Sequence, residues 1–411
     1  MFIGVGLLLS STTPLWAGEM DVLLDKLVEK GILSPIEANI IKDETKERVT
    51  KEVSEAKSYA VPAWVQNTKI KGDVRLRYQY EMKDQDIAPR HRGRVRARVG
   101  IISKIAQNLN AGIGLASGSA DPRSTNATLE NTFDKPDIRL DYAFVEWLTR
   151  VKGLKMIGGK FVFTDYLWAP TDMLWDTDIN PEGGSLHYEM ALMNNLDFWV
   201  NGGVWIIDEN GKVQEQDPFM KYVQTGLTFT EGIVDAKAAV TYYSPHSVKD
   251  KVLENTASTN TAPASHLQSL YRSLGFGTEI GLNKPFGGLP FNIDERIAVF
   301  GEYVKNLDDS VLTDELSGHS FGFVLGSAKV SDPKTWQFRY IKTKLEKDAF
   351  LDTFPDSDRF GGATDIEAHE GIFSYAPKKN VTLNLDYYKS WRLRVPGNKE
   401  RLLQADVVFK F

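Results

Sequence analysis

The chain ends with Leu402-Leu-Gln-Ala-Asp-Val-Val-Phe-Lys-Phe411, and this stretch decides the fold class. Successive side chains of a β-strand point to opposite faces of a sheet. One face would carry Phe411, Phe409, Val407, Ala405 and Leu403, and the other Lys410, Val408, Asp406, Gln404 and Leu402. The pattern predicts a strand that has one apolar and one largely polar surface and ends on an aromatic residue. A strand of this kind could also belong to the sheet of an ordinary soluble protein.

The composition restricts the class of protein. The chain has 411 residues, of which 25% are charged and 42% hydrophobic, and it has no Cys. The lack of Cys excludes a disulfide scaffold and thiolate metal sites. A formal net charge of −6 argues against a nucleic-acid partner. No apolar run reaches the roughly 20 residues that a membrane-spanning helix needs, so a membrane protein of this sequence would have to be a β-barrel.

The first residues are typical of a secretory signal. Phe2 to Leu9 is an apolar run, and the following polar stretch ends at Ala17, after which we expect cleavage. Two features depart from the pattern: no Lys or Arg precedes the apolar run, and Leu15 stands where a small residue is usual. We therefore predict a signal peptide over residues 1–17, with a buried amino-terminal strand or helix as the alternative.

Residues 18–60 have a different periodicity. Apolar residues recur at helical spacing from Leu23 to Val28, and again from Ile36 to Val53. The sequence Ser34-Pro-Ile-Glu37 predicts an N-cap followed by a proline at the first helical position. The narrow apolar stripe favours a self-associating helical or coiled-coil segment. A charged linker is the alternative.

The apolar period changes from 3.6 to 2 at Lys69. From there to Tyr80, apolar and Gly residues alternate with polar ones, and from Arg92 to Ile101 four arginines alternate with Gly and apolar residues. A strand can carry alternate arginines only where that face meets water. Residues 69–411 are therefore predicted to form one β-domain.

The same pattern recurs to the end of the chain and predicts about 16 strands, an even number of membrane-spanning length. Short turns alternate with long loops, of which 117–137, 164–183, 244–270 and 347–365 are the longest. This asymmetry is typical of outer-membrane barrels. Aromatic residues at strand ends, such as Tyr78, Tyr80, Tyr242 and Tyr243, are predicted to form interfacial girdles. Beyond the first two, the strands are expected near 107–117, 138–149, 154–163, 184–193, 196–207, 219–230, 233–244, 271–284, 292–305, 318–328, 335–347, 366–376, 380–390 and 401–411.

Several motifs resemble the putative porin family of bacterial outer-membrane β-barrels. They are Gly72-Asp-Val-Arg-Leu-Arg-Tyr78, Arg92-Gly-Arg-Val-Arg-Ala-Arg98, Asp121-Pro-Arg-Ser-Thr-Asn126, Ile138-Arg-Leu-Asp-Tyr-Ala143, Leu174-Trp-Asp-Thr-Asp-Ile-Asn-Pro-Glu-Gly183, Gly361-Gly-Ala-Thr-Asp365 and the terminal Phe411. The resemblance implies an all-β transmembrane antiparallel barrel with a short amino-terminal helical segment. It further implies a homotrimeric diffusion channel in outer-membrane lipid. Phe409 and Phe411 would then belong to the signal that the barrel assembly machinery reads.

The charge pattern indicates where selectivity would reside. Between Lys69 and Lys104 there are eleven Lys or Arg against four Asp or Glu. A simple hairpin would place Arg75 opposite Arg96 and Arg77 opposite Arg94, and like charges so placed destabilise a sheet. We therefore expect a pore-lining basic wall of Arg75, Arg77, Arg92, Arg94, Arg96 and Arg98. In porins the third loop at the long-loop end commonly narrows the lumen. Here that loop is 164–183, the third after 83–89 and 117–137, and its acids Asp165, Asp172, Asp176 and Asp178 are the constriction candidates. Simple pairing of the arginines with these acids, with no net selectivity, is the alternative.

No motif indicates catalysis, a cofactor or a metal. The stretch that starts at Asp176 begins like a calcium loop, but Pro181 occupies the place of the required Gly and His187 that of the bidentate Glu. The six His are scattered, and none shows metal-ligand spacing. We expect an outer-membrane porin for small hydrophilic solutes or ions, with a modest anion preference and its helical segment in the periplasm. A structural outer-membrane anchor with a plugged barrel is the alternative.

Overall fold

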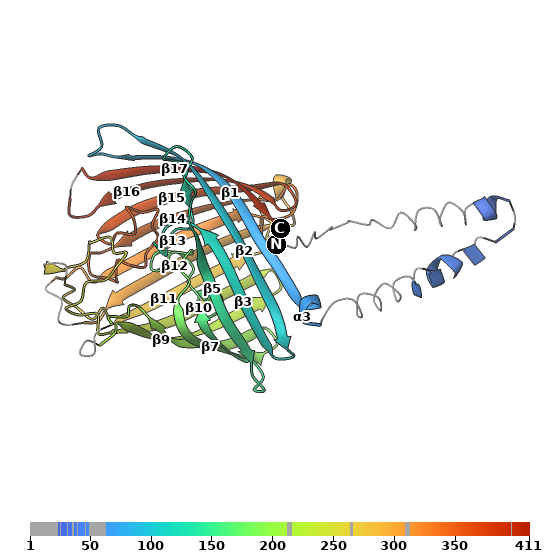
Figure 1. Ribbon diagram of the computed structural model, residues 1–411, viewed down its shortest axis with the longest axis horizontal. Helices are drawn as coiled ribbons and strands as arrows, with labels where there is room; N and C mark the ends of the chain where they lie inside the picture. Colours follow the sequence, from blue (N-terminus) through green and yellow to red (C-terminus); the bar gives the residue numbers. More distant parts are fainter. Residues whose placement is uncertain are drawn as a thin grey trace, which may run out of the picture. The chain divides into compact units, whose positions relative to one another are not determined.

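The fold is a closed antiparallel β-barrel, as the sequence predicted (Figure 1). The computed structural model describes residues 63–411 except 212–215, 264–265, 309–312 and 396. It also describes residues 24, 26–30, 32–34, 37–38, 40–45 and 47–48. The expected signal peptide and its cleavage site lie outside the described residues. Contacts divide the chain into two units, Met1–Asn67 and Thr68–Phe411.

The described parts of the first unit contain two short helical stretches, within residues 24–29 and 37–48. The predicted N-cap is present. The Ser34 backbone N–H and hydroxyl both donate to a Glu37 carboxylate oxygen at 2.8 Å, and the Glu37 N–H donates back to the Ser34 hydroxyl at 3.2 Å. This reciprocal arrangement is a capping box. A one-turn helix, α3 (Ala63–Gln66), precedes the first strand in the sequence. No helix among the described residues is long and apolar enough to cross a membrane.

Sixteen long strands of the second unit pair in sequence order, and the last pairs with the first. A two-residue strand, β4, adds to the edge of β2 inside the connection from β3 to β5. The strands are β1 (Thr68–Lys83), β2 (Arg90–Ala106), β3 (Leu109–Ser117), β4 (Ala127–Thr128), β5 (Ile138–Leu148), β6 (Leu154–Lys160), β7 (Glu182–Met193), β8 (Leu196–Ile206), β9 (Phe219–Glu231), β10 (Val234–His246), β11 (Ser273–Leu282), β12 (Arg296–Asn306), β13 (Ser317–Gly326), β14 (Trp336–Leu345), β15 (Ile366–Lys378), β16 (Val381–Arg392) and β17 (Lys399–Lys410).

Short and long connections alternate, as expected. The short ones, such as 107–108, 194–195 and 232–233, define the tight-turn end of the barrel. The connection from β11 to β12 is an exception at this end, because it runs over 283–295 and includes the 3₁₀ turn η3 (Pro290–Asn292). The long loops gather at the opposite end. Both Thr68 and Lys410 lie at the tight-turn end, because β1 runs from it and β17 returns to it antiparallel.

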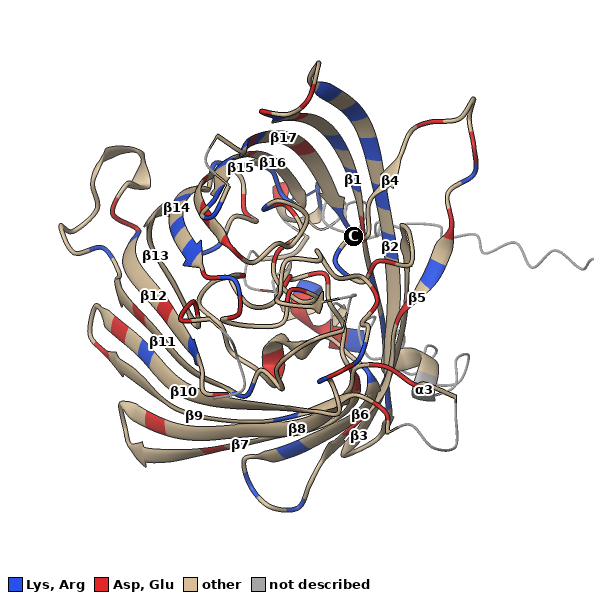
Figure 2. Ribbon diagram, turned by 90° about the vertical axis from the view of Figure 1, so that its left-hand side faces the viewer, with Lys and Arg blue, Asp and Glu red and all other residues tan. Residues whose placement is uncertain are grey.

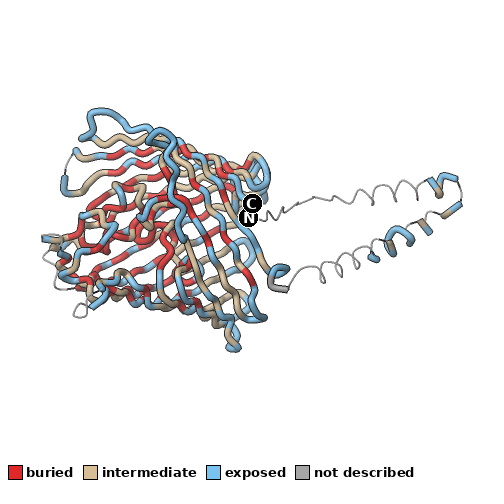
Figure 3. The backbone as a smooth tube through the Cα atoms, viewed as in Figure 1, coloured by how far each residue is buried: buried red, intermediate tan, exposed pale blue. Residues whose placement is uncertain are grey.

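Period-two alternation separates the two faces of the wall (Figure 3). Val74, Leu76, Val99 and Ile101 are exposed on the outside, whereas Arg77 and Arg96 on the alternate positions are buried inside. An apolar outward belt and a polar interior are what a barrel surrounded by lipid requires. One girdle prediction was wrong: Tyr242 is exposed, but Tyr243 is 2% exposed and packs inside the barrel, because consecutive strand residues face opposite ways.

Long loops fold into the interior and pack there (Figure 2). The 161–181 loop, which contains the 3₁₀ turn η1 (Phe163–Asp165), contributes Trp175 to a buried cluster with Trp205 and Phe350. Trp175 stacks on Phe354 of the 346–365 loop with ring centroids 4.7 Å apart. These rings fix the 161–181 loop against the wall on one side of the lumen.

The 247–272 and 346–365 loops are joined by buried carboxylates. Asp352 accepts hydrogen bonds from the backbone N–H groups of Thr259 and Asn260 at 2.5 and 3.1 Å. Asp348 accepts from the Thr261 N–H at 2.7 Å and from the Tyr271 hydroxyl at 2.9 Å. A large part of the interior is therefore filled by ordered loops.

Candidate functional site

The basic wall forms with the predicted register. Asp73 lies opposite Arg98, Arg75 opposite Arg96, and Arg77 opposite Arg94. Because strand faces alternate, these side chains share the lumenal face of the β1–β2 hairpin, along which Figure 2 shows bands of basic residues. The wall runs from Asp73 near the tight-turn end toward Arg92 near the long-loop end.

Most of the wall arginines contact carboxylates. Arg77 makes a bidentate pair with Asp406 of β17, with Nε–Oδ1 and Nη2–Oδ2 distances of 2.7 and 2.8 Å. Arg75 Nη1 lies 3.7 Å from the same Asp406 carboxylate. Bidentate charge-assisted bonds are the strong kind of hydrogen bond, so Asp406 anchors two arginines at once.

Asp73 holds the next two arginines in the same way. Its Oδ1 accepts from Arg96 Nε at 2.9 Å, and its Oδ2 from Arg98 Nε at 2.8 Å. Farther along, Arg92 forms an ion pair with Glu81. Asp73 and Glu81 thus balance the two ends of the wall, and Asp406 balances its centre.

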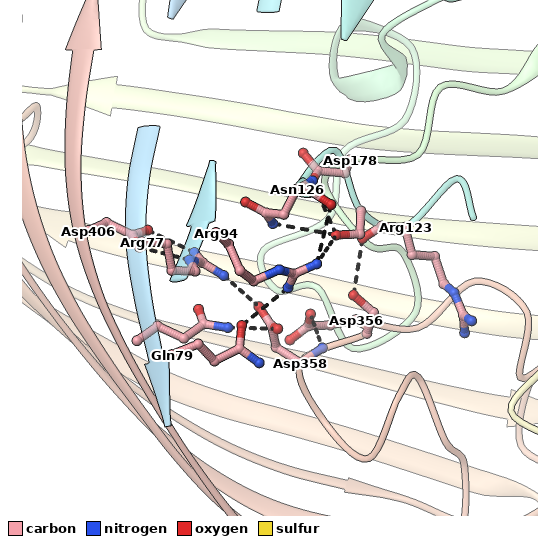
Figure 4. Close-up of polar contacts among 12 residues, drawn as sticks. Arg77, Gln79, Arg94, Arg123, Asn126, Asp178, Asp356, Asp358 and Asp406 are labelled. Carbon is pink, nitrogen blue, oxygen red and sulfur yellow. Dashed lines mark hydrogen bonds and ion pairs between the residues drawn. The ribbon is translucent and has the colours of Figure 1, made fainter. Parts of the chain in front are cut away.

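Arg94 differs from the other five wall arginines. Its described partners are neutral: the Gln79 side-chain oxygen at 3.2 Å, the Ser124 hydroxyl at 3.4 Å and the Asn126 carbonyl at 3.4 Å (Figure 4). Among the described residues no carboxylate lies within ion-pair distance of it. Arg94 is therefore the wall cation whose charge is least compensated by direct contact.

Two loops besides the 161–181 loop contact the basic wall (Figure 4). We call the part of the lumen between the wall and these three loops the narrow region. In the 118–137 loop, Asn126 accepts from Arg75 Nη2 at 2.6 Å. In the 346–365 loop, Asp358 lies 3.8 Å from Arg77 Nη1. Arg123 connects the two loops, because its Nη1 donates to the Gly361 carbonyl at 3.1 Å and its carbonyl accepts from the Ser357 hydroxyl at 3.0 Å.

The four predicted constriction acids have different fates. Asp178 reaches the wall, with its Oδ1 3.5 Å from Arg98 Nη1, and it accepts from the Thr125 N–H at 3.3 Å. Asp176 lies buried behind it and accepts from the Asp178 and Ser357 N–H groups, both at 2.9 Å. Asp165 is not brought to the wall: its side chain is 75% exposed, and Lys155 Nζ lies 4.0 Å away.

Asp172 belongs to another cluster, where it contacts Arg359 beside Asp356 and Glu370. The three carboxylates are close enough to share a cation. The Arg359 guanidinium already supplies that positive charge, with Nη2 2.6 Å from the Glu370 carboxylate. The cluster ties the 161–181 loop to the 346–365 loop and to β15. It fixes these loops to the barrel and does not belong to the basic wall.

Burial changes the proton affinity of the loop acids. Loss of hydration, with the neighbouring charge of Asp178, raises the pKa of Asp176 to about 8. Burial also raises the pKa of Asp356 well above its usual range, and the charge of Asp172 acts in the same direction. Around neutral pH, Asp176 is therefore largely protonated and adds little negative charge beside the wall.

A cavity of about 1010 Å³ leads to the wall from the tight-turn end. We call it the vestibule. Its outer part is lined by Lys71, Lys329 and Lys410, and its inner part by Asp73, Arg75, Arg96, Arg98 and Asp178. Three of the predicted wall arginines, Arg75, Arg96 and Arg98, and the loop residue Asp178 thus lie at the inner end of this cavity.

The predicted assembly residues lie where the barrel closes. Phe409 pairs with Val74 on the exposed outer face. Phe411 exchanges two backbone hydrogen bonds of 3.0 Å with Gly72. Its ring lies over Gly72, where an added Cβ would approach the Phe411 Cζ to 2.4 Å.

Sequence reasoning missed Asp406, Asp358 and Asn126 as parts of the site. For Asp406 the signal was present, because it lies on the polar face of the quoted terminal strand, and closure brings that face to Arg77. Asp358 and Asn126 lie in irregular loops, whose side-chain directions have no period to follow.

Comparison with known proteins confirms the resemblance to porins. A family model described as putative porin matches residues 85–273, which include the Arg92–Arg98 motif. Among solved structures, the high-pH form of OprB from Pseudomonas putida matches with a TM-score of 0.56 and 10% identity, over 84% of this chain and 95% of that chain. This likeness shows the fold.

Two further solved structures align less closely. A loop L8 deletion mutant of OmpT, an outer-membrane protein of Vibrio cholerae, gives a TM-score of 0.48 and 12% identity, over 84% of this chain and 100% of that chain. A triple mutant of the Rhodopseudomonas blastica porin gives 0.42 and 9%, over 84% and 100%. The comparison with curated proteins found no match.

Proposed function

We propose that this protein is an outer-membrane porin that lets small hydrophilic solutes and ions diffuse through a narrow charged region. The observation that carries the proposal is the vestibule, which ends at the wall formed by Arg75, Arg96 and Arg98 inside a barrel with an apolar outer face. The family match and the porin fold of the OprB likeness support the same function. The 161–181 loop, fixed inside the barrel, narrows the passage.

We infer a modest anion preference. Five wall arginines (Arg75, Arg77, Arg94, Arg96 and Arg98) face four nearby acids (Asp73, Asp178, Asp358 and Asp406), and Arg94 has only neutral direct partners. Guanidinium groups stay charged at any relevant pH. Rings of opposed charge in a narrow pore set selectivity by attraction and repulsion, so a small excess of arginine favours anions only slightly.

The amino-terminal segments and the oligomeric state belong to the same proposal. We propose that residues 1–17 are a signal peptide, that 18–60 form a periplasmic helical segment, and that 69–411 span the membrane as a homotrimer with outer-membrane lipid around it. The capping box at Ser34 and the unit boundary at Asn67 support a separate helical segment. The trimer rests on the resemblance to porins, and chemical cross-linking in native membranes tests it.

A second function remains open to the same experiment. The filled interior, with the Trp175 cluster and the Asp348 and Asp352 bonds between loops, favours a structural anchor whose barrel does not conduct. Purified protein in planar bilayers separates the two. A porin gives discrete open steps with a reversal potential in a salt gradient, whereas a closed anchor gives no steps under any gradient.

A further inference from the structure

The vestibule carries a net positive charge. Three acids line it, Asp73, Asp141 and Asp178. They are outnumbered by six basic residues, Lys71, Arg75, Arg96, Arg98, Lys329 and Lys410. One large aromatic side chain of the middle wall, Tyr142, lines the same cavity. A cavity that joins fixed positive charge to an aromatic surface indicates more than passage of inorganic ions.

A β-bulge aims Tyr142 into this cavity. The pairing of β3 with β5 shifts by one residue there, since Gly114 lies opposite Tyr142 whereas Leu115 lies opposite Leu140. The shift places Asp141 and Tyr142, which are consecutive, both on the cavity. Bulges of this kind re-aim side chains next to functional sites.

Glycines hold the ring flat against the wall. A Cβ added at Gly114 would approach Tyr142 Cε1 to 2.3 Å, and one added at Gly100 would approach the Tyr142 hydroxyl to 1.7 Å. Phe144 lies over Gly112 in the same way, with its ring centroid 5.8 Å from that of Tyr142. One face of the Tyr142 ring is thus covered by glycine backbone, and the ring adjoins the cavity.

Arg98 lies beside this ring. It is two residues before Gly100 on the same face of β2, so its Cα is about 7 Å from that of the glycine beneath the Tyr142 hydroxyl. Its side chain is 34% exposed, more than that of Arg75 or Arg96. Asp73 contacts its Nε, and Asp178 lies near its Nη1. Among the described residues, its Nη2 donates no hydrogen bond.

We propose that Tyr142 and Arg98 form a binding subsite for aromatic carboxylates, a proposal that rests on the channel function above. The ligand's ring stacks on Tyr142, and its carboxylate accepts a charge-assisted hydrogen bond from Arg98 Nη2. Asp141 and Asp178 repel the carboxylate from their side of the cavity and so orient it toward the arginine. Such solutes dwell in the vestibule before they pass the narrow region.

The competing explanation is that Tyr142 only fills space over glycines, as aromatic residues do in many sheets. A space-filling ring would interact equally with any apolar carboxylate of similar size. Stacking distinguishes aromatic from saturated rings, and the arginine distinguishes an anion from a neutral amide. Three probes therefore separate the explanations: benzoate, cyclohexanecarboxylate and benzamide.

The experiment measures the block of single-channel current by each probe in planar bilayers that contain the full-length protein. We expect benzoate to block at a concentration about tenfold lower than cyclohexanecarboxylate, the factor that one aromatic contact gives. Benzoate should also block at about tenfold lower concentration than benzamide, because the neutral amide cannot form the charge-assisted hydrogen bond with Arg98. Tyr142→Phe should keep the difference between benzoate and cyclohexanecarboxylate, and Tyr142→Leu should abolish it. Arg98→Gln should weaken benzoate block and leave benzamide unchanged. Tyr387→Leu, at an exposed position on the outer face, is the matched control and should behave as wild type.

Failure of this proposal differs from failure of the channel function. If discrete steps appear but benzoate and cyclohexanecarboxylate block alike, the subsite is overturned and the channel stands. If no steps appear, the channel function is overturned, and calorimetric titration of benzoate into the wild-type protein in detergent decides the subsite. Binding that Tyr142→Leu abolishes would support the subsite, and no heat of binding in wild type would overturn it. Heat-modifiable migration on gels verifies that each variant is folded.

Discussion

Arg77 and Asp406 form a bidentate ion pair across the junction of the first and last strands, 329 positions apart in the chain. Both side chains are almost wholly buried, at 4% and 2% exposure. The pair therefore joins two roles: it holds the closing strands together at the level of the wall, and it fixes the direction of a guanidinium that faces the narrow region.

Removing one partner of this pair should destabilise the barrel. Asp406→Ala leaves the buried Arg77 charge without its main partner, and such losses cost about 3 kcal/mol. The urea midpoint of unfolding in detergent, followed by heat-modifiable migration, measures the change. The double variant Arg77→Met with Asp406→Leu removes both charges of the bidentate pair. It should lose less, although Arg75 and Asp358 each lose one longer contact of 3.7 and 3.8 Å. A double variant with a lower urea midpoint than Asp406→Ala would contradict this account.

Loss of the terminal aromatic residue should impair assembly. Phe411→Ser removes the ring that lies over Gly72 and weakens the apolar face of the closing strand. We expect a several-fold decrease of folded protein in outer-membrane fractions, measured by heat-modifiable migration at equal expression. Val95→Glu, which places a charge on the lipid face of β2, should hinder insertion by a different route. Normal folded levels for Phe411→Ser would show that the residue is no part of the assembly signal.

Charge reversal in the wall should change selectivity. The Arg94→Glu, Arg96→Glu double variant adds negative charge to the basic wall, so its reversal potential in a salt gradient should move toward cation preference. Lys152→Glu is the control. It also replaces a positive side chain by a negative one, but at an exposed turn, and it should leave the reversal potential unchanged. An unchanged potential in the double variant would favour full compensation of the arginines by their acids.

Selectivity should also depend on pH through Asp176. Its pKa is about 8 in the folded loop, so raising the pH from 6 to 9 adds one negative charge behind Asp178 and should weaken the anion preference. Folding raises this pKa above the value of about 3.9 for an exposed aspartate. The attached state of the loop therefore loses stability as the pH rises from about 4 to about 8, because ionisation then favours the detached loop. Asp176→Asn cannot ionise, and its reversal potential should be flat over pH 6 to 9. The same pH dependence in the variant would assign it to another group.

The barrel should fold without the helical segment. Deletion of residues 19–57, with a working signal retained, removes only residues that precede the unit boundary at Asn67. We expect the shortened chain to refold in detergent with an unchanged urea midpoint. A chain that does not refold would show that the two parts depend on each other.

The wall could be predicted from sequence because lipid on one side and water on the other impose a strict period of two. That period gave the strand number, and the hairpin geometry gave the pairing of Arg75 with Arg96 and of Arg77 with Arg94. The interior could not be predicted in the same way. Tyr243 looked like an interfacial aromatic, and its neighbour Tyr242 is exposed, so only the phase of the alternation decides which of them faces the loops.

The loops carry no periodic signal at all. Asn126 and Asp358 reach the wall because three long loops pack against one another around Arg123 and Trp175. Such contacts join residues far apart in sequence, and a single sequence does not indicate which loop meets which. The third loop was assigned to the lumen by resemblance. The parts played by the 118–137 and 346–365 loops became visible only in the folded chain.

The pairing of β1 with β17 also has a consequence for how the molecule forms. β1 has one neighbour, β2, soon after synthesis, but its other edge stays without a partner until the last strand has been made. Until then the chain exposes two unsatisfied strand edges, which are templates for aggregation. Contacts of such long sequence separation form slowly. Pairing of β17 with β1 therefore removes both exposed edges at once. Any delay in this pairing prolongs the time during which the whole chain can aggregate.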